Sequence, residues 1–266
     1  MRVLIAACVL ALGAPFTASA APAYDGSQAA TPRQERILEL LDRARTVDDI
    51  EHRPGYDRSC DPGACVFGEP WTDDHAGPKG HNGCTTREDV LLMQMKDIEM
   101  RWGSSCRIYE ARLRDPYSGE RMTWRDDGYY ISIDHVYPLA RAWHGGAWRW
   151  PMRKRVAFAN DVRRELLAVS ARTNQAKEAD GPADWLPRWR RSHCGYVRRY
   201  VRAAVAWDLP LTTADADVAA DVVAVPAAPR REPVGRSVGL LGLVGARRDG
   251  EQLPADVVGE AGAPTG

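Results

Sequence analysis

Two periodicities of apolar residues divide the chain into helical ends and a β-rich middle. Apolar positions recur at helical spacing after Thr31 and Pro32, a capping residue followed by a proline suited to a first turn. The same spacing predicts helices over residues 87–102 and 153–159, and an amphipathic helix over residues 196–205. The pattern therefore predicts helices on both sides of a central segment.

Strand signals fill that central segment. Residues 106–113 and 121–124 are predicted strands, joined by a turn at 115–119 in which proline sets φ and glycine provides the tight exit. Residues 129–134 alternate between apolar and polar with a period of two, and residues 166–169 are a short apolar run typical of a buried strand. Strands and helices in this order predict an α+β fold.

The two ends of the chain differ from the rest. Arg2 precedes an apolar run at 3–12 and small residues at 18–20, which predicts a secretory signal peptide over residues 1–20. The run is too short to span a bilayer, so we expect secretion and no stable membrane insertion. Residues 213–266 contain no aromatic side chain and are expected to be mostly disordered, with room for a short helix.

Cysteine usage agrees with export. Disulfides are the expected state of cysteines outside the cell. Cys60 and Cys65 flank a turn and are expected to close a small loop. One bridge is expected among Cys84, Cys106 and Cys194, and the spacing leaves the pairing open.

Charge is balanced over the whole chain but not along it. The chain carries 36 basic and 36 acidic residues, whereas residues 134–207 carry 15 basic and 6 acidic ones, a net charge of +9. This segment is either a solvated arginine-rich surface or a face for the backbone of a nucleic acid, whose binding should weaken as salt rises.

Candidate chemistry lies in the same segment. Hydrolysis of a phosphodiester needs an activated water and neutralisation of charge on the phosphate. His135, at a predicted strand end, can take a proton from water because imidazole titrates near neutral pH. Asp134 and Asn174 offer oxygen ligands for a divalent cation, for which we expect Mg²⁺. Lys177, one turn after Asn174, is expected to meet a phosphate, and Asn160 to orient the loop that carries His135.

Each of these residues has an ordinary structural role when taken alone. An Asp-His pair often caps or hydrogen-bonds a turn, and a single asparagine is usually a surface or turn residue. The order of the parts favours a site: strand with Asp134 and His135, second strand, then helix with Asn174 and Lys177. We expect the imidazole of His135 and the oxygens of Asp134 and Asn174 to converge on one ion.

The same residues resemble a known family. The chain is similar to the secreted HNH endonucleases, which are related to the C-terminal nuclease domain of GmrSD-type restriction enzymes. The motifs that carry the resemblance are Asp134-His135-Val136-Tyr137-Pro138-Leu139, Trp143-His144-Gly145-Gly146-Ala147, Phe158-Ala159-Asn160-Asp161, Leu166-Leu167-Ala168-Val169-Ser170, Asn174-Gln175-Ala176-Lys177, Trp185-Leu186-Pro187, Asn82-Gly83-Cys84-Thr85-Thr86-Arg87, Asp115-Pro116-Tyr117-Ser118-Gly119 and Cys194-Gly195-Tyr196.

The resemblance implies a His-Me finger, a ββα core that holds one divalent metal, with additional helices and a β-hairpin. It implies an HNH nuclease domain over residues 54–212, preceded by a helical segment at 21–53 and followed by the tail.

The family's functional residues can be placed by position. His135 resembles the general base, Asp134 and Asn174 resemble the metal ligands, and Asn160 matches the middle asparagine. Lys177 matches a lysine found one turn past the last ligand in the wider HNH superfamily.

Three departures concern loop shape and phosphate contact. Residues 161–165 lack the Pro and Asn that many members have, and Glu178 stands where a glycine commonly follows the lysine. Ala203 and Ala204 occupy a stretch where relatives tend to carry a lysine. The loop between Cys60 and Cys65 is a further addition.

The leading prediction is a secreted, metal-dependent endonuclease that acts on DNA rather than RNA with little sequence preference, since nothing resembling a base-reading module is appended. The alternative is a disulfide-stabilised surface or binding module that keeps the scaffold without catalysis. A metallohydrolase acting on protein or cell wall is a third reading, disfavoured because the chain has no His-Glu-x-x-His motif.

Overall fold

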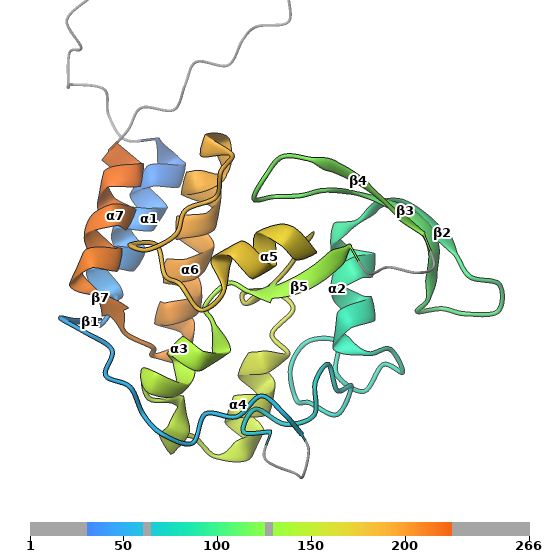
Figure 1. The fold of residues 1–266 in the computed structure, drawn as a ribbon, viewed down its shortest axis with the longest axis horizontal. Coiled ribbons are helices and arrows are strands. Elements are labelled where there is room, and N and C mark those ends of the chain that lie inside the picture. Colours follow the sequence, from blue (N-terminus) through green and yellow to red (C-terminus); the bar gives the residue numbers. More distant parts are fainter. Residues whose placement is uncertain (1–30, 61–64, 126–129, 225–266) are drawn as a thin grey trace, which may run out of the picture. The chain divides into compact units, whose positions relative to one another are not determined.

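The computed structural model describes residues 31–60, 65–125 and 130–224 (Figure 1). The predicted signal peptide and the tail beyond residue 224 lie outside these described residues. The described chain combines helices with short strands, which confirms the predicted α+β class. Across the described ranges, no helix has the length and apolar character needed to cross a membrane.

Helices from the two ends of the described chain pack together (Figure 1). Helix α1 (Pro32–Arg43) begins with a reciprocal capping box: the Gln34 N–H donates to the Thr31 hydroxyl, and the Thr31 N–H donates to the Gln34 side chain. Helix α6 (His193–Trp207) is the amphipathic helix that the sequence predicts. Both predictions are confirmed.

Helix α7 (Thr213–Ala224) occupies a segment for which the sequence predicts mostly disorder. It contacts α1 and α6 and buries Ala219 and Val223. Just before it, strand β7 (Leu211–Thr212) pairs in parallel with β1 (Thr46–Val47). The sequence analysis leaves room for a short helix in residues 213–266, and α7 is a helix of this segment that packs on the rest of the fold.

A second correction concerns the predicted helix over residues 87–102. Helix α2 (Thr86–Gln94) covers only its first half, and β2 (Lys96–Met100) follows. The side chain of Gln94 turns to the backbone of a neighbouring strand, where its amide donates to the Leu166 carbonyl (3.0 Å) and its oxygen accepts from the Ala168 N–H (2.9 Å). The helix ends here because this residue and the strand after it gain tertiary partners.

Strand β2 joins the predicted hairpin to make a three-stranded antiparallel sheet in the order β2-β3-β4. Strands β3 (Ile108–Arg114) and β4 (Arg121–Arg125) are joined by the predicted turn, where Gly119 has a φ of +76°. The Asp115 carboxylate accepts from the Tyr117 N–H (3.0 Å) inside this turn. The hairpin prediction is confirmed.

A separate strand pair and one helix form the central unit of the fold (Figure 1). Strand β5 (Ile131–His135) pairs antiparallel with β6 (Leu166–Ser170), and α5 (Ala171–Lys177) follows β6 directly. Ser170 caps α5 by accepting from the Thr173 N–H at 3.1 Å. Between β5 and β6 lie α3 (Leu139–His144), a 3₁₀ turn η1 (Ala147–Arg149) and α4 (Met152–Ala159), and between α5 and α6 lies η2 (Arg190–Ser192).

Strand β6 is buried on both faces because it separates two apolar cores. Leu166 and Ala168 belong to a core shared with α2 and the three-stranded sheet, while Leu167 and Val169 belong to a core shared with α1, α4, α6 and α7. The two cores thus hold β5 and β6 between them.

Two disulfides secure the loops. Cys60 and Cys65 are bonded, as the sequence predicts. Cys84 pairs with Cys106, a choice that the sequence left open, and Cys194 is free and partly buried.

Candidate functional site

The end of β5 places two candidate residues on opposite faces of the strand. Asp134 pairs with Leu167 and His135 with Leu166 across the sheet. Since successive side chains of an extended strand point to opposite sides, the Asp134 carboxylate and the His135 imidazole enter different surroundings. That these two groups and Asn174 converge on one ion therefore stays a prediction.

His135 is held as a neutral imidazole. Its Nε2 lies 2.9 Å from the carbonyl oxygen of Ala159, and because a carbonyl can only accept, Nε2 carries the hydrogen. The other nitrogen, Nδ1, is then an acceptor. Burial lowers the pKa of His135 to about 3, and the charge of Arg58 acts in the same direction. The indole of Trp71 stacks on the imidazole, with ring centroids 5.5 Å apart.

Asn160 acts on His135 through the end of α4. Its Nδ2 donates to the Val156 carbonyl (2.9 Å), which ties the last turn of the helix and so positions the carbonyl of Ala159. The Oδ1 atom of Asn160 is buried and has no hydrogen-bond partner among the described residues. The structure therefore brings Asn160 and His135 together, linked through Ala159.

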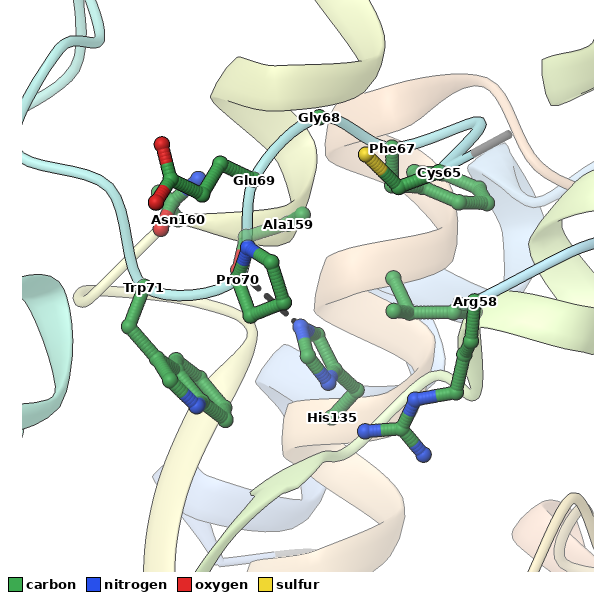
Figure 2. Close-up of a pocket in the computed structure, with 11 residues that line it drawn as sticks. Arg58, Cys65, Phe67, Gly68, Glu69, Pro70, Trp71, His135, Ala159 and Asn160 are labelled. Atoms are coloured by element: carbon green, nitrogen blue, oxygen red, sulfur yellow. Dashed lines mark hydrogen bonds between the residues drawn. The ribbon is translucent and has the colours of Figure 1, made fainter. Parts of the chain in front are cut away.

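A small cavity of about 50 Å³ lies beside the imidazole (Figure 2). This volume admits a few water molecules. In Figure 2, Arg58 and Asn160 lie on opposite sides of His135, and Trp71 lies along the ring. The cavity is lined by Arg58, Cys65, Phe67, Gly68, Glu69, Pro70, Trp71, His135, Leu139, Ala159 and Asn160.

The Asp134 carboxylate is satisfied inside the protein. Its Oδ1 accepts from the Lys177 ammonium (2.9 Å) and its Oδ2 from the hydroxyl of Tyr117 (2.5 Å). Lys177 also donates to the His135 carbonyl (3.0 Å) and is fully buried. Burial raises the pKa of Asp134, although the Lys177 charge opposes this shift. Lys177 thus contacts β5. The sequence analysis predicts that the same residue contacts a phosphate.

Asn174 lies one turn before Lys177 on α5 and is half-buried. The described residues contain no group of three or more His, Cys, Asp or Glu side chains that could hold a metal ion. The oxygen of Asp134 nevertheless holds a cation, because the Lys177 ammonium stands beside it. In this structure the chain therefore neutralises the Asp134 carboxylate with its own ammonium group.

Trp71 is a site residue that the sequence analysis missed. Its φ of +58° is a left-handed conformation, which a bulky residue adopts only where the surrounding structure holds it. It is one of nine tryptophans in the chain, and no local pattern distinguishes it from the others.

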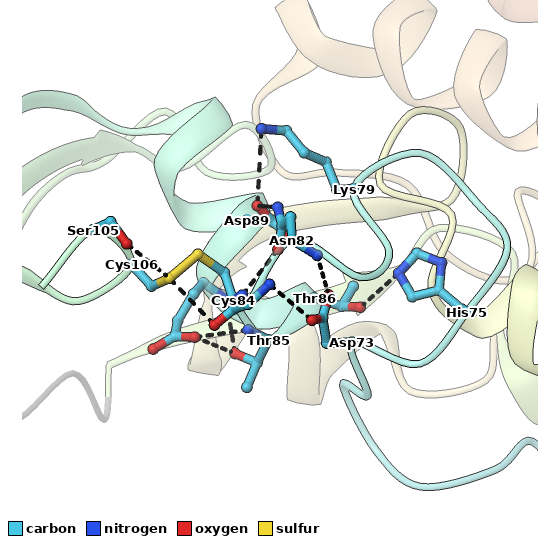
Figure 3. A network of polar contacts seen from close by, with 12 residues as sticks. Asp73, His75, Lys79, Asn82, Cys84, Thr85, Thr86, Asp89, Ser105 and Cys106 are labelled. Atoms are coloured by element: carbon cyan, nitrogen blue, oxygen red, sulfur yellow. Dashed lines mark hydrogen bonds and ion pairs between the residues drawn. A yellow bond between two sulfur atoms is a disulfide. The ribbon is translucent and has the colours of Figure 1, made fainter.

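A polar network holds the loop that follows Trp71 (Figure 3). Asp73 accepts from the Asn82 N–H (3.1 Å), and the Asn82 amide donates to the buried Asp89 carboxylate on α2 (2.9 Å). At the loop's end, the Thr86 N–H donates to the Trp71 carbonyl (3.1 Å). These contacts fix the backbone of Trp71 and so the position of its indole over His135.

Tyr117 and Arg58 are two further residues without a predicted role. Tyr117 lies in the predicted turn between β3 and β4. Its role is visible only from its hydrogen bond to Asp134, seventeen positions away. Arg58 lies beside the loop that the Cys60–Cys65 disulfide closes, and no local pattern in the sequence indicates a chemical role for it.

Together these features define an α+β protein with a histidine-centred site on a strand–strand–helix unit. The family of GmrSD restriction endonuclease C-terminal domains matches residues 85–220, just over half of the chain. The chain belongs to this family, whose name associates it with nuclease activity. The match includes all five predicted site residues and excludes Arg58 and Trp71.

A secreted relative supports the predicted location. The chain is 35% identical over 133 residues to an uncharacterized secreted protein of Arthroderma benhamiae. The aligned region is 50% of this chain and 63% of that relative. No solved structure matches the chain.

Proposed function

We propose that the protein is a secreted, metal-dependent endonuclease of the HNH type, in which β5, β6 and α5 form the His-Me finger. Its expected substrate is DNA, cleaved with little sequence preference. The observation that carries the proposal is the state of His135: a neutral imidazole with an acceptor nitrogen, beside a small cavity that Arg58 also lines, within the segment that matches the endonuclease family.

His135 can act as the general base of the reaction. The Ala159 carbonyl fixes the ring and its tautomer, so Nδ1 is the atom that accepts a proton from water. The low pKa keeps the imidazole neutral over the physiological range. A bound phosphate anion favours the protonated ring, so it would raise the pKa of His135 and strengthen it as a base.

Asp134 and Asn174 are the residues that would hold a divalent cation, with Mg²⁺ as the expected ion. When bound, such an ion neutralises charge on the phosphate and on the leaving oxygen. Lys177 would have to release Asp134 for this to occur, because its ammonium holds the same carboxylate.

Plasmid cleavage tests the nuclease proposal. The secreted chain should cut plasmid DNA in the presence of Mg²⁺, and a chelator should stop the reaction. His135→Ala should lower the rate by at least about 100-fold, the usual contribution of a general base. His52→Ala, which alters an exposed histidine outside the cavity, is the matched control. A parallel assay with RNA decides the substrate.

Two outcomes would contradict the proposal: no cleavage by the wild-type chain, or equal cleavage by His135→Ala. DNA binding that weakens with salt but gives no turnover would favour the alternative, a binding module without catalysis. The buried ion pair between Asp134 and Lys177 is the feature that favours this alternative.

A thermal-shift experiment tests the metal ligands separately from activity. Lys177→Met leaves the buried Asp134 charge unpaired and should lower stability by about 3–5 kcal/mol. If Asp134 is a metal ligand, Mg²⁺ should raise the melting temperature of Lys177→Met more than that of the wild type. The double variant Asp134→Asn with Lys177→Met should not respond. An equal response of the single and double variants would rule out Asp134 as a ligand.

A further inference from the structure

The wall of the cavity that faces His135 comes from outside the segment matched by the family. That wall consists of Arg58, Cys65 and residues 67–71, whereas the match begins at residue 85. The matched part contributes His135, Leu139, Ala159 and Asn160. The family-matched segment therefore supplies His135, the proposed base. The segment upstream of the match supplies the residues on the other side of the cavity, including Arg58.

The upstream wall is held firmly in place. The disulfide between Cys60 and Cys65 closes its loop, and the Val66 N–H donates to the Asp57 carbonyl (3.1 Å) across the base of that loop. Phe67 is buried against Phe158 of α4, with ring centroids 5.9 Å apart. The backbone at the start of the loop is thus fixed before any ligand arrives.

Arg58 is the cationic group of this wall. Its side chain is exposed, lines the cavity with His135, and has no hydrogen bond or ion pair with any described residue. Figure 2 shows the guanidinium beside the imidazole. Glu69 is the acidic group of the wall and lies away from Arg58, toward Asn160. At the side of the cavity away from Glu69, Arg58 therefore has no acidic partner within the described part of the chain.

Asn160, which lines the cavity, has a polar atom without a partner. Its Oδ1 is buried and has no hydrogen-bond partner among the described residues. The cavity is also lined by His135, which has an acceptor nitrogen, and by the cationic Arg58 beside it. It therefore suits a water molecule next to an anionic group.

We propose that Arg58 binds the phosphate that is cleaved beside His135, so that the disulfide-closed wall determines how this protein holds its substrate. The proposal rests on the nuclease function proposed above. A guanidinium presents paired N–H donors that match two phosphate oxygens, which a lysine cannot reproduce.

Substitution of Arg58 tests the proposal. Arg58→Gln should lower kcat/KM by about 10- to 100-fold, the range expected for loss of a charge-assisted contact. Arg58→Lys should recover only part of this loss. The melting temperature should not change, because the side chain is exposed. Arg36→Gln removes the same charge from the exposed face of α1 and should cleave like the wild type.

The disulfide provides a second measurement. Replacing Cys60 and Cys65 by serine should lower kcat/KM in the wild-type background, because Arg58 is then held less firmly. In the Arg58→Gln background the same replacement should have no further effect, since coupled residues are not additive. Equal losses in both backgrounds would show that the disulfide acts through stability alone.

Binding separates failure of this proposal from failure of the nuclease assignment. In the His135→Ala background, the anisotropy of a labelled DNA oligonucleotide reports binding without cleavage. Weaker binding by Arg58→Gln than by Arg36→Gln would support the phosphate contact even if no cleavage occurs. If the wild type cleaves and Arg58→Gln matches it in both assays, the proposal is overturned while the nuclease assignment stands.

Discussion

The buried polar groups around Asp134 show how single residues are constrained in this fold. Lys177 is fully buried, which is tolerable only because its ammonium donates to Asp134 and to the backbone of β5. Glu165 is equally buried, and its Oε1 accepts from the Tyr137 N–H at 2.8 Å. Its Oε2 has no partner among the described residues. Glu165 is therefore the less satisfied acid of this cluster.

Glu165 should make stability depend on pH. Burial, and next the charge of Asp134, raise the pKa of Glu165 well above 4.5. Glu165 then keeps a proton in the folded state that it releases in the unfolded chain. The free energy of unfolding is therefore highest below about pH 4.5 and falls as pH rises toward the pKa of Glu165 in the folded state. Glu165→Gln removes this loss: each unit of raised pKa corresponds to about 1.4 kcal/mol gained at higher pH.

Urea unfolding at pH 4 and pH 8 measures the effect. The Glu165→Gln variant should be more stable than the wild type at pH 8 and nearly equal at pH 4. Glu39→Gln, at an exposed position of α1, should match the wild type at both values. A gain that is the same at pH 4 and pH 8 would argue that the carboxyl group does not titrate in this way.

Among the site residues, His135 and Asn160 could be chosen from the sequence because their chemistry and order within the motifs are local signals. Trp71 and Arg58 could not. Their contribution depends on a loop that folds back onto β5, and neither loop position has a periodicity or a spacing that reveals its partner.

Elements with strong local periodicity were predicted from the sequence, whereas α7 lies in a segment for which the sequence predicts mostly disorder with room for a short helix. Its pattern of Ala, Val and Asp has no wide apolar face, and helices of this kind gain most of their stability from packing. Asp215, in its first turn, is fully buried and paired with Arg141 of α3. It also accepts from the Ala183 N–H at 3.0 Å. One carboxylate thus joins α7 to two distant parts of the chain.

Removing that carboxylate should destabilise the protein. Asp215→Ala leaves Arg141 without its partner, and breaking a buried pair costs about 3–5 kcal/mol. Asp217→Ala changes an exposed acid of the same helix and should have little effect. Urea unfolding compares the two variants. Equal stabilities would indicate that α7 contributes no more than an exposed surface segment.

The end of α2 illustrates the same dependence on tertiary contacts. The sequence predicts that the helix continues to residue 102, yet it stops at Gln94, whose side chain bonds the backbone of β6. The residues that follow pair with β3. A local preference for helix was overridden by hydrogen bonds to strands that lie distant in sequence.

At the scale of the molecule, the family-matched residues are enclosed by segments that the match does not include. Helix α1 packs on α6 and α7, and β1 pairs with β7. One wall of the His135 cavity consists of Arg58, Cys65 and residues 67–71. The basic residues of the 134–207 segment include exposed arginines such as Arg163, Arg188 and Arg190, which agrees with a surface for a polyanion.

The sequence by itself determined what depends on neighbouring residues: the cap of α1, the hairpin and the alternation of β5. Only the tertiary structure decided that Lys177 holds Asp134, that Cys84 pairs with Cys106, that Trp71 covers the imidazole and that α7 closes the fold. Periodicity and capping are short-range effects within a few residues, whereas Lys177 and Asp134 are 43 positions apart. Their contact is set by the packing of α5 on β5, which no local pattern encodes.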